Sequence, residues 1–172
     1  VMSFNNKLSV QIEKYKEDVI QFLMCPSNLK YWTAHKGICY SKEREQWVER
    51  RVNKEGKFSA YSVVTKRDGD HITVSWPERK VTVVFAAKAL TFQHTTVTAI
   101  LPSDCSEKFM SWLRQLLTME LNILKATLEK NRECIPKRMF NRLENLHLEI
   151  IGKKRRISIS ATELKGFKGE VL

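Results

Sequence analysis

Residues 106–131 read SEKFMSWLRQLLTMELNILKATLEKN, and the rest of the chain is best understood from this stretch. Ser106 or Asp104 can cap a helix here, because short polar side chains accept hydrogen bonds from the first free N–H groups. At about 100° per residue, the apolar side chains gather on one stripe of the helix. These are Phe109, Leu113, Leu116, Ile123 and Leu124. The pattern predicts a long amphipathic helix that packs this stripe against another layer.

In the chain before this helix, apolar residues tend to recur at every second position. Six segments are rich in β-branched and aromatic residues and are bounded by turn residues, which is typical of strands. They are Ile38–Ser41, Gln46–Val52, Phe58–Lys66, His71–Trp76, Val81–Leu90 and Thr95–Leu101. The short connections between them favour antiparallel neighbours, so we predict a meander.

The first 32 residues supply the opening elements. We expect a strand over Lys7–Glu13, where apolar residues alternate, and a short amphipathic helix that includes Val19–Leu23. Pro26 to Asn28 interrupts this helix, and a second helical turn then carries Trp32. The order of elements predicts an α+β fold in which an antiparallel sheet packs on the long helix.

This order, and short motifs within it, resemble one known superfamily. The matching residues are the opening segment with Pro26, Asn28 and Trp32, the hairpin with Gln46–Val48 and Gly56, the last strand ending at Pro102, and the helix ending Glu120–Glu129. They resemble the START-like or SRPBCC superfamily with its helix-grip fold. The chain is most similar to the polyketide cyclase/dehydrase and lipid-transport branch, close to the Hsp90-ATPase-activator-like proteins.

The resemblance implies a curved sheet that wraps around the long helix and leaves a cavity for an apolar or amphipathic small molecule. It assigns residues 1–131 to the ligand-binding domain. The candidate lining residues are Trp32, Trp47, Phe58, Tyr61, Trp76, Phe85, Phe109, Trp112, Leu113, Leu116 and Glu120. The same residues also suit a filled core, because aromatic side chains at these periods are commonly buried.

Glu120 falls inside the apolar stripe of the long helix. A carboxylate there must be paired, hydrated or protonated, because an unpaired buried charge is costly. Glu120 is then the polar anchor or acid/base of the pocket, or it pairs with a strand arginine such as Arg51, or it reaches solvent at the rim. Glu49 and Arg51 share a strand face with Trp47. If this face is concave, Glu49 and Arg51 lie in the pocket; we favour the convex alternative, a solvated charge pair, since one face of an antiparallel sheet is usually wet.

Three classes of function remain open at this stage. The favoured one is noncovalent binding of a small molecule, as a carrier or sensor. The second is a protein-interaction or co-chaperone-like module with a filled core. The third is a cyclase-type enzyme that uses Glu120, which would need a second positioned polar group. The sequence favours a protein without catalytic activity.

The composition of the chain limits which metals, cofactors and macromolecular partners we expect. The four cysteines, at positions 25, 39, 105 and 134, form no C-x-x-C pair, and no H-E-x-x-H occurs, so we expect no metal and no cofactor. The net charge of +11 attracts nucleic acid or anionic lipid without specificity. No apolar run approaches about 18 residues and no signal peptide is visible, which predicts a cytoplasmic protein without a transmembrane segment.

Residues 132–172 lie beyond the resembling domain and are predicted to be a basic extension. We expect an amphipathic helix over 136–151 and a short strand over 157–161. The apolar face of this helix comprises Met139, Phe140, Leu143, Leu146 and Ile150. It can dock on its own domain or on a second copy. We favour a homodimer through residues 136–161, because an element joined through the Pro136 break is well placed for exchange between protomers.

Overall fold

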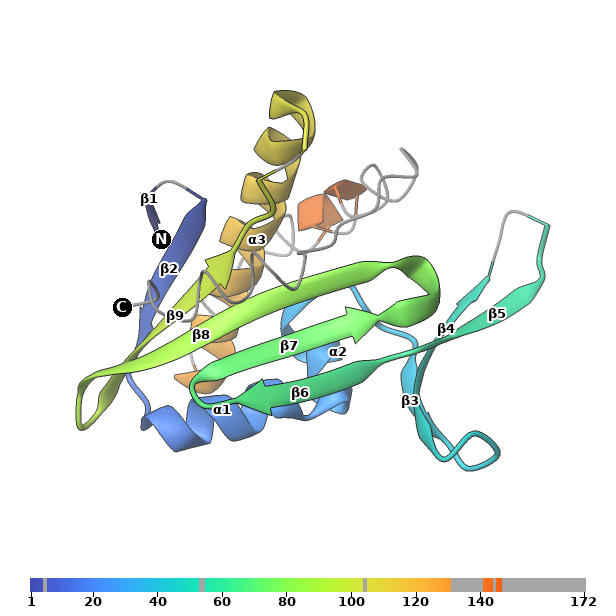
Figure 1. Ribbon diagram of the computed structural model, residues 1–172, viewed down its shortest axis with the longest axis horizontal. Helices are drawn as coiled ribbons and strands as arrows, with labels where there is room; N and C mark the ends of the chain where they lie inside the picture. Colours follow the sequence, from blue (N-terminus) through green and yellow to red (C-terminus); the bar gives the residue numbers. More distant parts are fainter. Residues whose placement is uncertain (5, 53–54, 104, 131–140, 144, 147–172) are drawn as a thin grey trace.

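The computed structural model describes residues 1–4, 6–52, 55–103, 105–130, 141–143 and 145–146. Its larger sheet has six antiparallel strands in the order β1-β2-β9-β8-β7-β6 (Figure 1). The strands are β1 (Met2–Phe4), β2 (Lys7–Ile12), β6 (Val64–Asp68), β7 (His71–Trp76), β8 (Val81–Thr91) and β9 (His94–Ile100). The alternation of buried apolar residues places one face of this sheet over the core, as in β2, where Leu8, Val10 and Ile12 are all buried.

A second antiparallel sheet, β3-β4-β5, comprises β3 (Ile38–Ser41), β4 (Gln46–Val52) and β5 (Phe58–Ser62). The sequence predicted one meander with a continuous strand over Phe58–Lys66, and this is wrong. The chain leaves the second sheet at Val63 and enters the larger sheet as β6. Ser62 and Val63 are both buried, so the alternation of the strand breaks at this corner. The N–H of Val63 still donates to the carbonyl of Trp47 at 2.9 Å.

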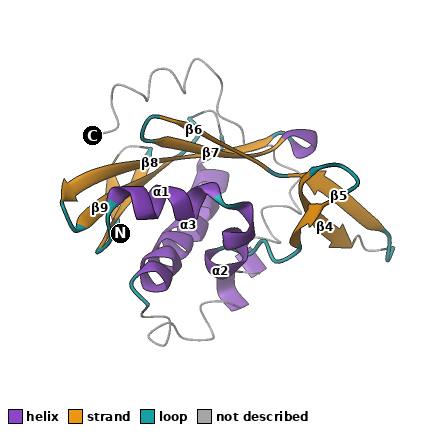
Figure 2. Ribbon diagram, turned by 90° about the horizontal axis from the view of Figure 1, so that it is seen from below, coloured by secondary structure: helices purple, strands orange, loops and turns teal. Residues whose placement is uncertain are grey.

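The helices cover one face of the larger sheet (Figure 2). They are α1 (Lys16–Met24), the 3-10 turn η1 (Pro26–Asn28), α2 (Leu29–Trp32) and α3 (Glu107–Leu128), and a further 3-10 turn, η2 (Pro77–Arg79), joins β7 to β8. The predicted stripe of α3 is confirmed, because Phe109, Leu113, Leu116, Ile123 and Leu124 are all buried. The predicted α+β helix-grip architecture, a curved antiparallel sheet around a long helix, is therefore present.

Ser106 caps α3 in the way its residue type predicts. Its Oγ accepts a hydrogen bond from the N–H of Phe109 at 3.3 Å. We expect Ser106→Ala to lower the free energy of unfolding by about 1 kcal/mol, because one N–H at the helix start loses its acceptor. Urea denaturation measures this change. Ser111→Ala is the matched control, since Ser111 is exposed within the same helix, and an equal loss in both variants would contradict the capping role.

The described part of the extension packs against its own chain. Leu143 and Leu146 are buried, and they belong to the same apolar cluster as the stripe of α3. Nη2 of Arg142 donates to Oε1 of Gln115 on α3 at 3.3 Å. Most of the predicted helix 136–151 and the whole of the strand 157–161 lie outside the described residues. The homodimer through residues 136–161 stays a prediction.

Candidate functional site

Glu120 is buried in α3, with only 6% of its surface accessible. Its position follows from the helical period, because Leu116 lies one turn before it and Leu124 one turn after. Within the described residues its carboxyl group has no hydrogen bond and no ion pair. Burial raises the pKa of Glu120 to about 8. At neutral pH the group is therefore mostly protonated, and it can both donate and accept a hydrogen bond.

The oxygen atoms of Glu120 are also not sealed away. Over the described part of the chain, the fully enclosed side-chain atoms that lack a hydrogen-bond partner are His71 Nε2 and Thr127 Oγ1. Glu120 is not among them, although it has no protein partner there. A water-sized group can thus reach its carboxyl group, which distinguishes it from a sealed polar defect of the core.

A second buried carboxylate, Glu49, is surrounded by donors. Its side chain accepts from Nε1 of Trp76 at 2.7 Å and from Nε of Arg51 at 2.7 Å. Nδ1 of His35 lies 2.9 Å from Oε2, which places the ring proton on Nδ1. The His35 ring stacks on Trp76, with the ring centroids 4.5 Å apart. Strands β4 and β7 and the loop after α2 thus converge on one carboxylate.

The expectation that Glu49 and Arg51 form a solvated pair on a convex face is wrong. Glu49 is only 2% exposed, and the side chain of Arg51 is 23% exposed. This face of β4 is covered because Trp76 and the loop after α2 lie against it. The alternative pairing of Arg51 with Glu120 does not occur either, since Arg51 contacts Glu49 instead.

The environment of Glu49 strongly favours its charged form. Burial by itself raises the pKa of this carboxyl group, but its hydrogen bond with His35 and the charges of His35 and Arg51 act in the opposite direction, as does the hydrogen bond from Trp76. Together these interactions lower its pKa to about 2. The arrangement is an ion pair at physiological pH rather than a proton donor.

His35 is held in place by the loop that follows α2. The hydroxyl of Thr33 donates to the carbonyl of Leu29 at 2.7 Å and accepts from the N–H of His35 at 3.1 Å. The carbonyl of Gly37 then accepts from the N–H of Arg50 on β4 at 2.9 Å. A Cβ at position 37 would collide with the Arg50 carbonyl. The absence of a side chain at Gly37 therefore lets this loop approach the strand that carries Glu49.

Arg79, at the end of η2, adds a further cation beside this cluster. Its guanidinium lies over the ring of Tyr61, 5.4 Å from the centroid. Burial lowers the pKa of Arg79, and so does the charge of Arg51, while Glu49 acts in the opposite direction. Sequence reasoning missed both Arg79 and His35 as site residues, because they lie in non-periodic turns where spacing carries no signal.

The predicted lining residues fall into three groups by exposure. Trp32, Trp76, Phe85, Phe109, Leu113, Leu116 and Glu120 are buried, whereas Trp47, Tyr61 and Trp112 are partly buried and pack against the core. Trp32 and Phe85 meet edge to face, with their centroids 5.5 Å apart. Phe58 is 77% exposed on β5 and lies apart from the others. Whether the buried residues line a cavity stays a prediction.

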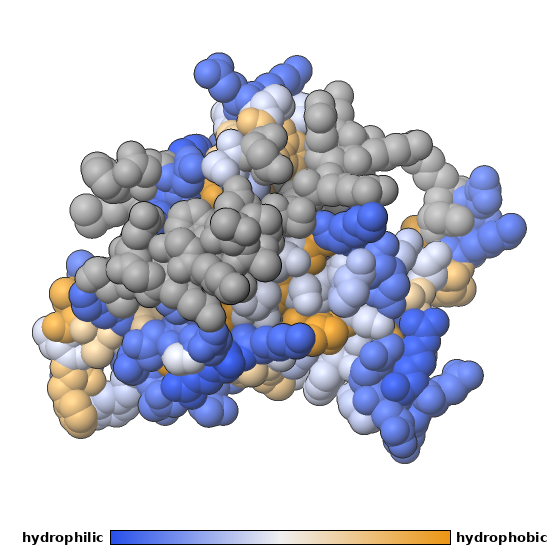
Figure 3. Space-filling view, viewed as in Figure 1, coloured by the Kyte–Doolittle hydropathy of each residue, from blue (hydrophilic) through white to orange (hydrophobic). Residues whose placement is uncertain are grey.

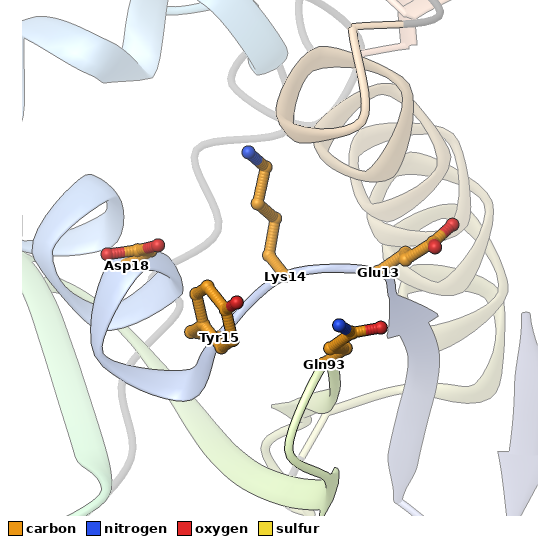
Figure 4. Close-up of a pocket in the computed structure, with 5 residues that line it drawn as sticks. All are labelled: Glu13, Lys14, Tyr15, Asp18 and Gln93. Carbon is orange, nitrogen blue, oxygen red and sulfur yellow. The ribbon is translucent and has the colours of Figure 1, made fainter.

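Hollows lined by described residues lie elsewhere on the surface. The first, of about 260 Å³, lies between the end of β2, the start of α1 and the β8–β9 turn (Figure 4). Its lining is formed by Glu13, Lys14, Tyr15, Asp18 and Gln93. The second, of about 450 Å³, adjoins the N-terminal half of α3 and includes Cys105, Met110 and Arg114. None of the predicted lining residues borders either hollow.

The tip of the β8–β9 hairpin is apolar and exposed. Leu90 is 55% and Phe92 82% exposed, and the Phe92 ring meets Tyr15 edge to face at 4.9 Å. In Figure 3 hydrophobic surface gathers at the left end, where Figure 1 places this hairpin.

No group of three His, Cys, Asp or Glu side chains in the described ranges is placed to hold a metal ion. Across those same ranges, every helix is too short or too polar to cross a membrane.

The geometry described above is that of a helix-grip protein, and solved structures of low sequence identity share it. A START superfamily protein from Mycobacterium smegmatis superimposes with a TM-score of 0.52 at 10% identity, over 72% of this chain and 96% of that one. A conserved protein of unknown function from Enterococcus faecalis gives 0.50 at 17% identity, over 87% and 85%. XoxI from Bacillus cereus gives 0.50 at 16% identity, over 71% and 93%.

The chain matches no family model and no curated protein sequence. The structural likeness nevertheless agrees with the resemblance found in the sequence. The chain has the START-like helix-grip fold.

Proposed function

We infer that this protein binds an apolar or amphipathic small molecule noncovalently, between α3 and the larger sheet, as a carrier or sensor. The observation that carries this proposal is the carboxyl group of Glu120. It lies on the apolar stripe of α3, it has no partner among the described residues, and its oxygen atoms are not sealed. Natural cores rarely keep such a group without a use, because a lost hydrogen bond costs about 1–3 kcal/mol.

The raised pKa of Glu120 suits a neutral ligand group. A carboxylic acid that stays mostly protonated at pH 7 donates a hydrogen bond to a ligand carbonyl and accepts one from a hydroxyl. The surrounding apolar side chains then bury the rest of the ligand, and a few polar groups within an apolar pocket are the usual composition of such sites. The START-like fold supports this location.

A probe titration with a blocking variant tests the proposal. Leu116 lies one helical turn before Glu120, so Leu116→Trp places a large side chain over the carboxyl group. We expect Nile red, an uncharged apolar dye, to bind the natural protein saturably at one site. We expect Leu116→Trp to weaken this binding by about tenfold or more, because the added ring occupies the pocket. Fluorescence measures the binding, and circular dichroism checks that the variant is folded.

Asn122→Trp is the matched control, because Asn122 is exposed on the same helix and gains the same ring. It should bind the dye as the natural protein does. Absence of saturable binding in the natural protein, or equal binding by a folded Leu116→Trp variant, would refute the proposal. Such a result would favour the interaction module with a filled core.

A cyclase-type reaction is less well supported than binding. Acid–base catalysis at Glu120 needs a second polar group within hydrogen-bonding reach of the reacting atoms. Within the described residues no side chain hydrogen-bonds to Glu120. Glu49, the other buried carboxylate, is held in its charged form by three donors.

A further inference from the structure

Two arginines, Arg51 and Arg79, lie beside the buried carboxylate of Glu49 at the junction between the two sheets. Glu49 is the carboxylate at its centre, and its hydrogen bonds are used by His35, Arg51 and Trp76. The side chains of Arg51 and Arg79 are both only partly exposed.

The guanidinium of Arg79 has no carboxylate partner within the part of the chain that the structure describes. Its neighbour Glu78 is engaged elsewhere, because it accepts from the hydroxyl of Ser62 at 2.7 Å and from the Ser62 N–H at 3.0 Å. The contact that Arg79 makes is with the ring of Tyr61. A partly buried guanidinium without a carboxylate in contact is costly, and an anion bound to it offsets this cost.

The Arg79 guanidinium lies next to the apolar interior. Tyr61, on which Arg79 rests, is partly buried and packs against the core, as do Trp47 and Val81. Trp76 belongs to the core itself and donates to Glu49. An anion bound at Arg79 thus lies at the rim of the core, with apolar side chains on its inner side.

We propose that Arg79, with Arg51 beside it, binds the anionic group of the ligand, a carboxylate or a phosphate. This inference rests on the proposed function, and it identifies the ligand as an amphipathic anion. The planar guanidinium presents two parallel N–H groups that match the oxygen pair of a carboxylate or phosphate. The Tyr61 ring holds this plane from one side, while the apolar part of the ligand extends toward the core.

The test compares the binding of three probes, one of which carries both an alkyl chain and an anion, while each of the others carries only one of these features. Decanoate carries both an alkyl chain and an anion, 1-decanol carries the chain alone, and inorganic phosphate carries the anion alone. We expect the natural protein to bind decanoate more tightly than 1-decanol. Arg79→Gln should weaken decanoate binding by about tenfold or more, because charge-assisted hydrogen bonds are lost, and should leave 1-decanol binding unchanged. Isothermal titration calorimetry measures each affinity.

Two further variants test whether decanoate binding requires the guanidinium of Arg79 itself or only a positive charge. Arg79→Lys keeps the charge but loses the planar fork, so its affinity for decanoate should lie between those of the natural protein and Arg79→Gln. Arg50→Gln removes one positive charge from the adjacent position of β4, where the side chain is exposed. It should leave decanoate binding within about twofold, because exposed charges are well screened.

Each of the other possible binding results overturns at least one of the two proposals. Equal binding of decanoate and 1-decanol, unchanged in Arg79→Gln, overturns the anionic ligand but leaves the proposed function standing. Binding of inorganic phosphate alone, lost in Arg79→Gln, makes this a site for free anions and overturns both its link to the ligand and the proposed function. Binding of none of the probes overturns both proposals. If Arg79→Gln fails to fold, Arg79→Lys and the comparison of the three probes still decide.

Discussion

Glu49→Ala is expected to lower the free energy of unfolding at pH 7 by about 3–5 kcal/mol, because it leaves the donors of Arg51, His35 and Trp76 without their buried acceptor. Two of these donors come from the loop after α2 and from β7, so the loss also loosens the junction between the sheets. Urea denaturation, followed by tryptophan fluorescence, measures the change. Glu43→Ala, at an exposed position in the β3–β4 turn, should change stability by less than about 0.5 kcal/mol.

The loss in free energy of unfolding caused by Glu49→Ala should become smaller at acidic pH. The pKa of Glu49 is about 2 in the folded protein and near 4.5 in the unfolded chain. A lowered carboxyl pKa contributes stability that is fully present above the unfolded value and is lost as the pH falls through the folded value. The difference between the natural protein and the variant should therefore be constant above pH 5 and decrease between pH 5 and pH 2. A difference that does not depend on pH in this window would contradict the ion-pair role.

Glu120→Gln is expected to show the opposite pH dependence. The pKa of Glu120 is about 8 when folded, above its value of 4.5 in the unfolded chain. The unfolded state therefore binds fewer protons between these values, so the natural protein loses stability as the pH rises from about 4.5 to 8. The loss amounts to at most about 5 kcal/mol, from 1.36 kcal/mol per pKa unit. Glutamine cannot ionise, so this contribution is absent from the variant.

The two proteins should accordingly be similar at pH 5, and Glu120→Gln should be the more stable by several kcal/mol at pH 9. Thermal or urea unfolding at both pH values gives the difference. Glu107→Gln, at an exposed position in the first turn of the same helix, provides the control and should change stability equally at both. If the stability difference for Glu120→Gln is also the same at pH 5 and pH 9, the buried, ionisable state of Glu120 is disproved.

Local patterns determined the secondary structure from the sequence. Ile38–Ser41, Gln46–Val52 and His71–Trp76 were predicted with the bounds that the structure has. The stripe of α3 and the burial of Glu120 also followed from sequence, because the helical period is a property of neighbouring residues and needs no knowledge of the rest of the fold. The resemblance to a known superfamily supplied the arrangement of sheet and helix.

The tertiary structure alone decided which residues surround the buried carboxylate of Glu49. Alternation correctly placed Glu49 and Arg51 on one face of β4, but it cannot say which face the fold covers. That face is covered because the chain leaves the second sheet at Val63, enters the larger sheet and brings Trp76 against Glu49, 27 residues away along the sequence. His35 and Arg79 join from turns without periodicity. Long-range packing creates this cluster, and no local pattern encodes it.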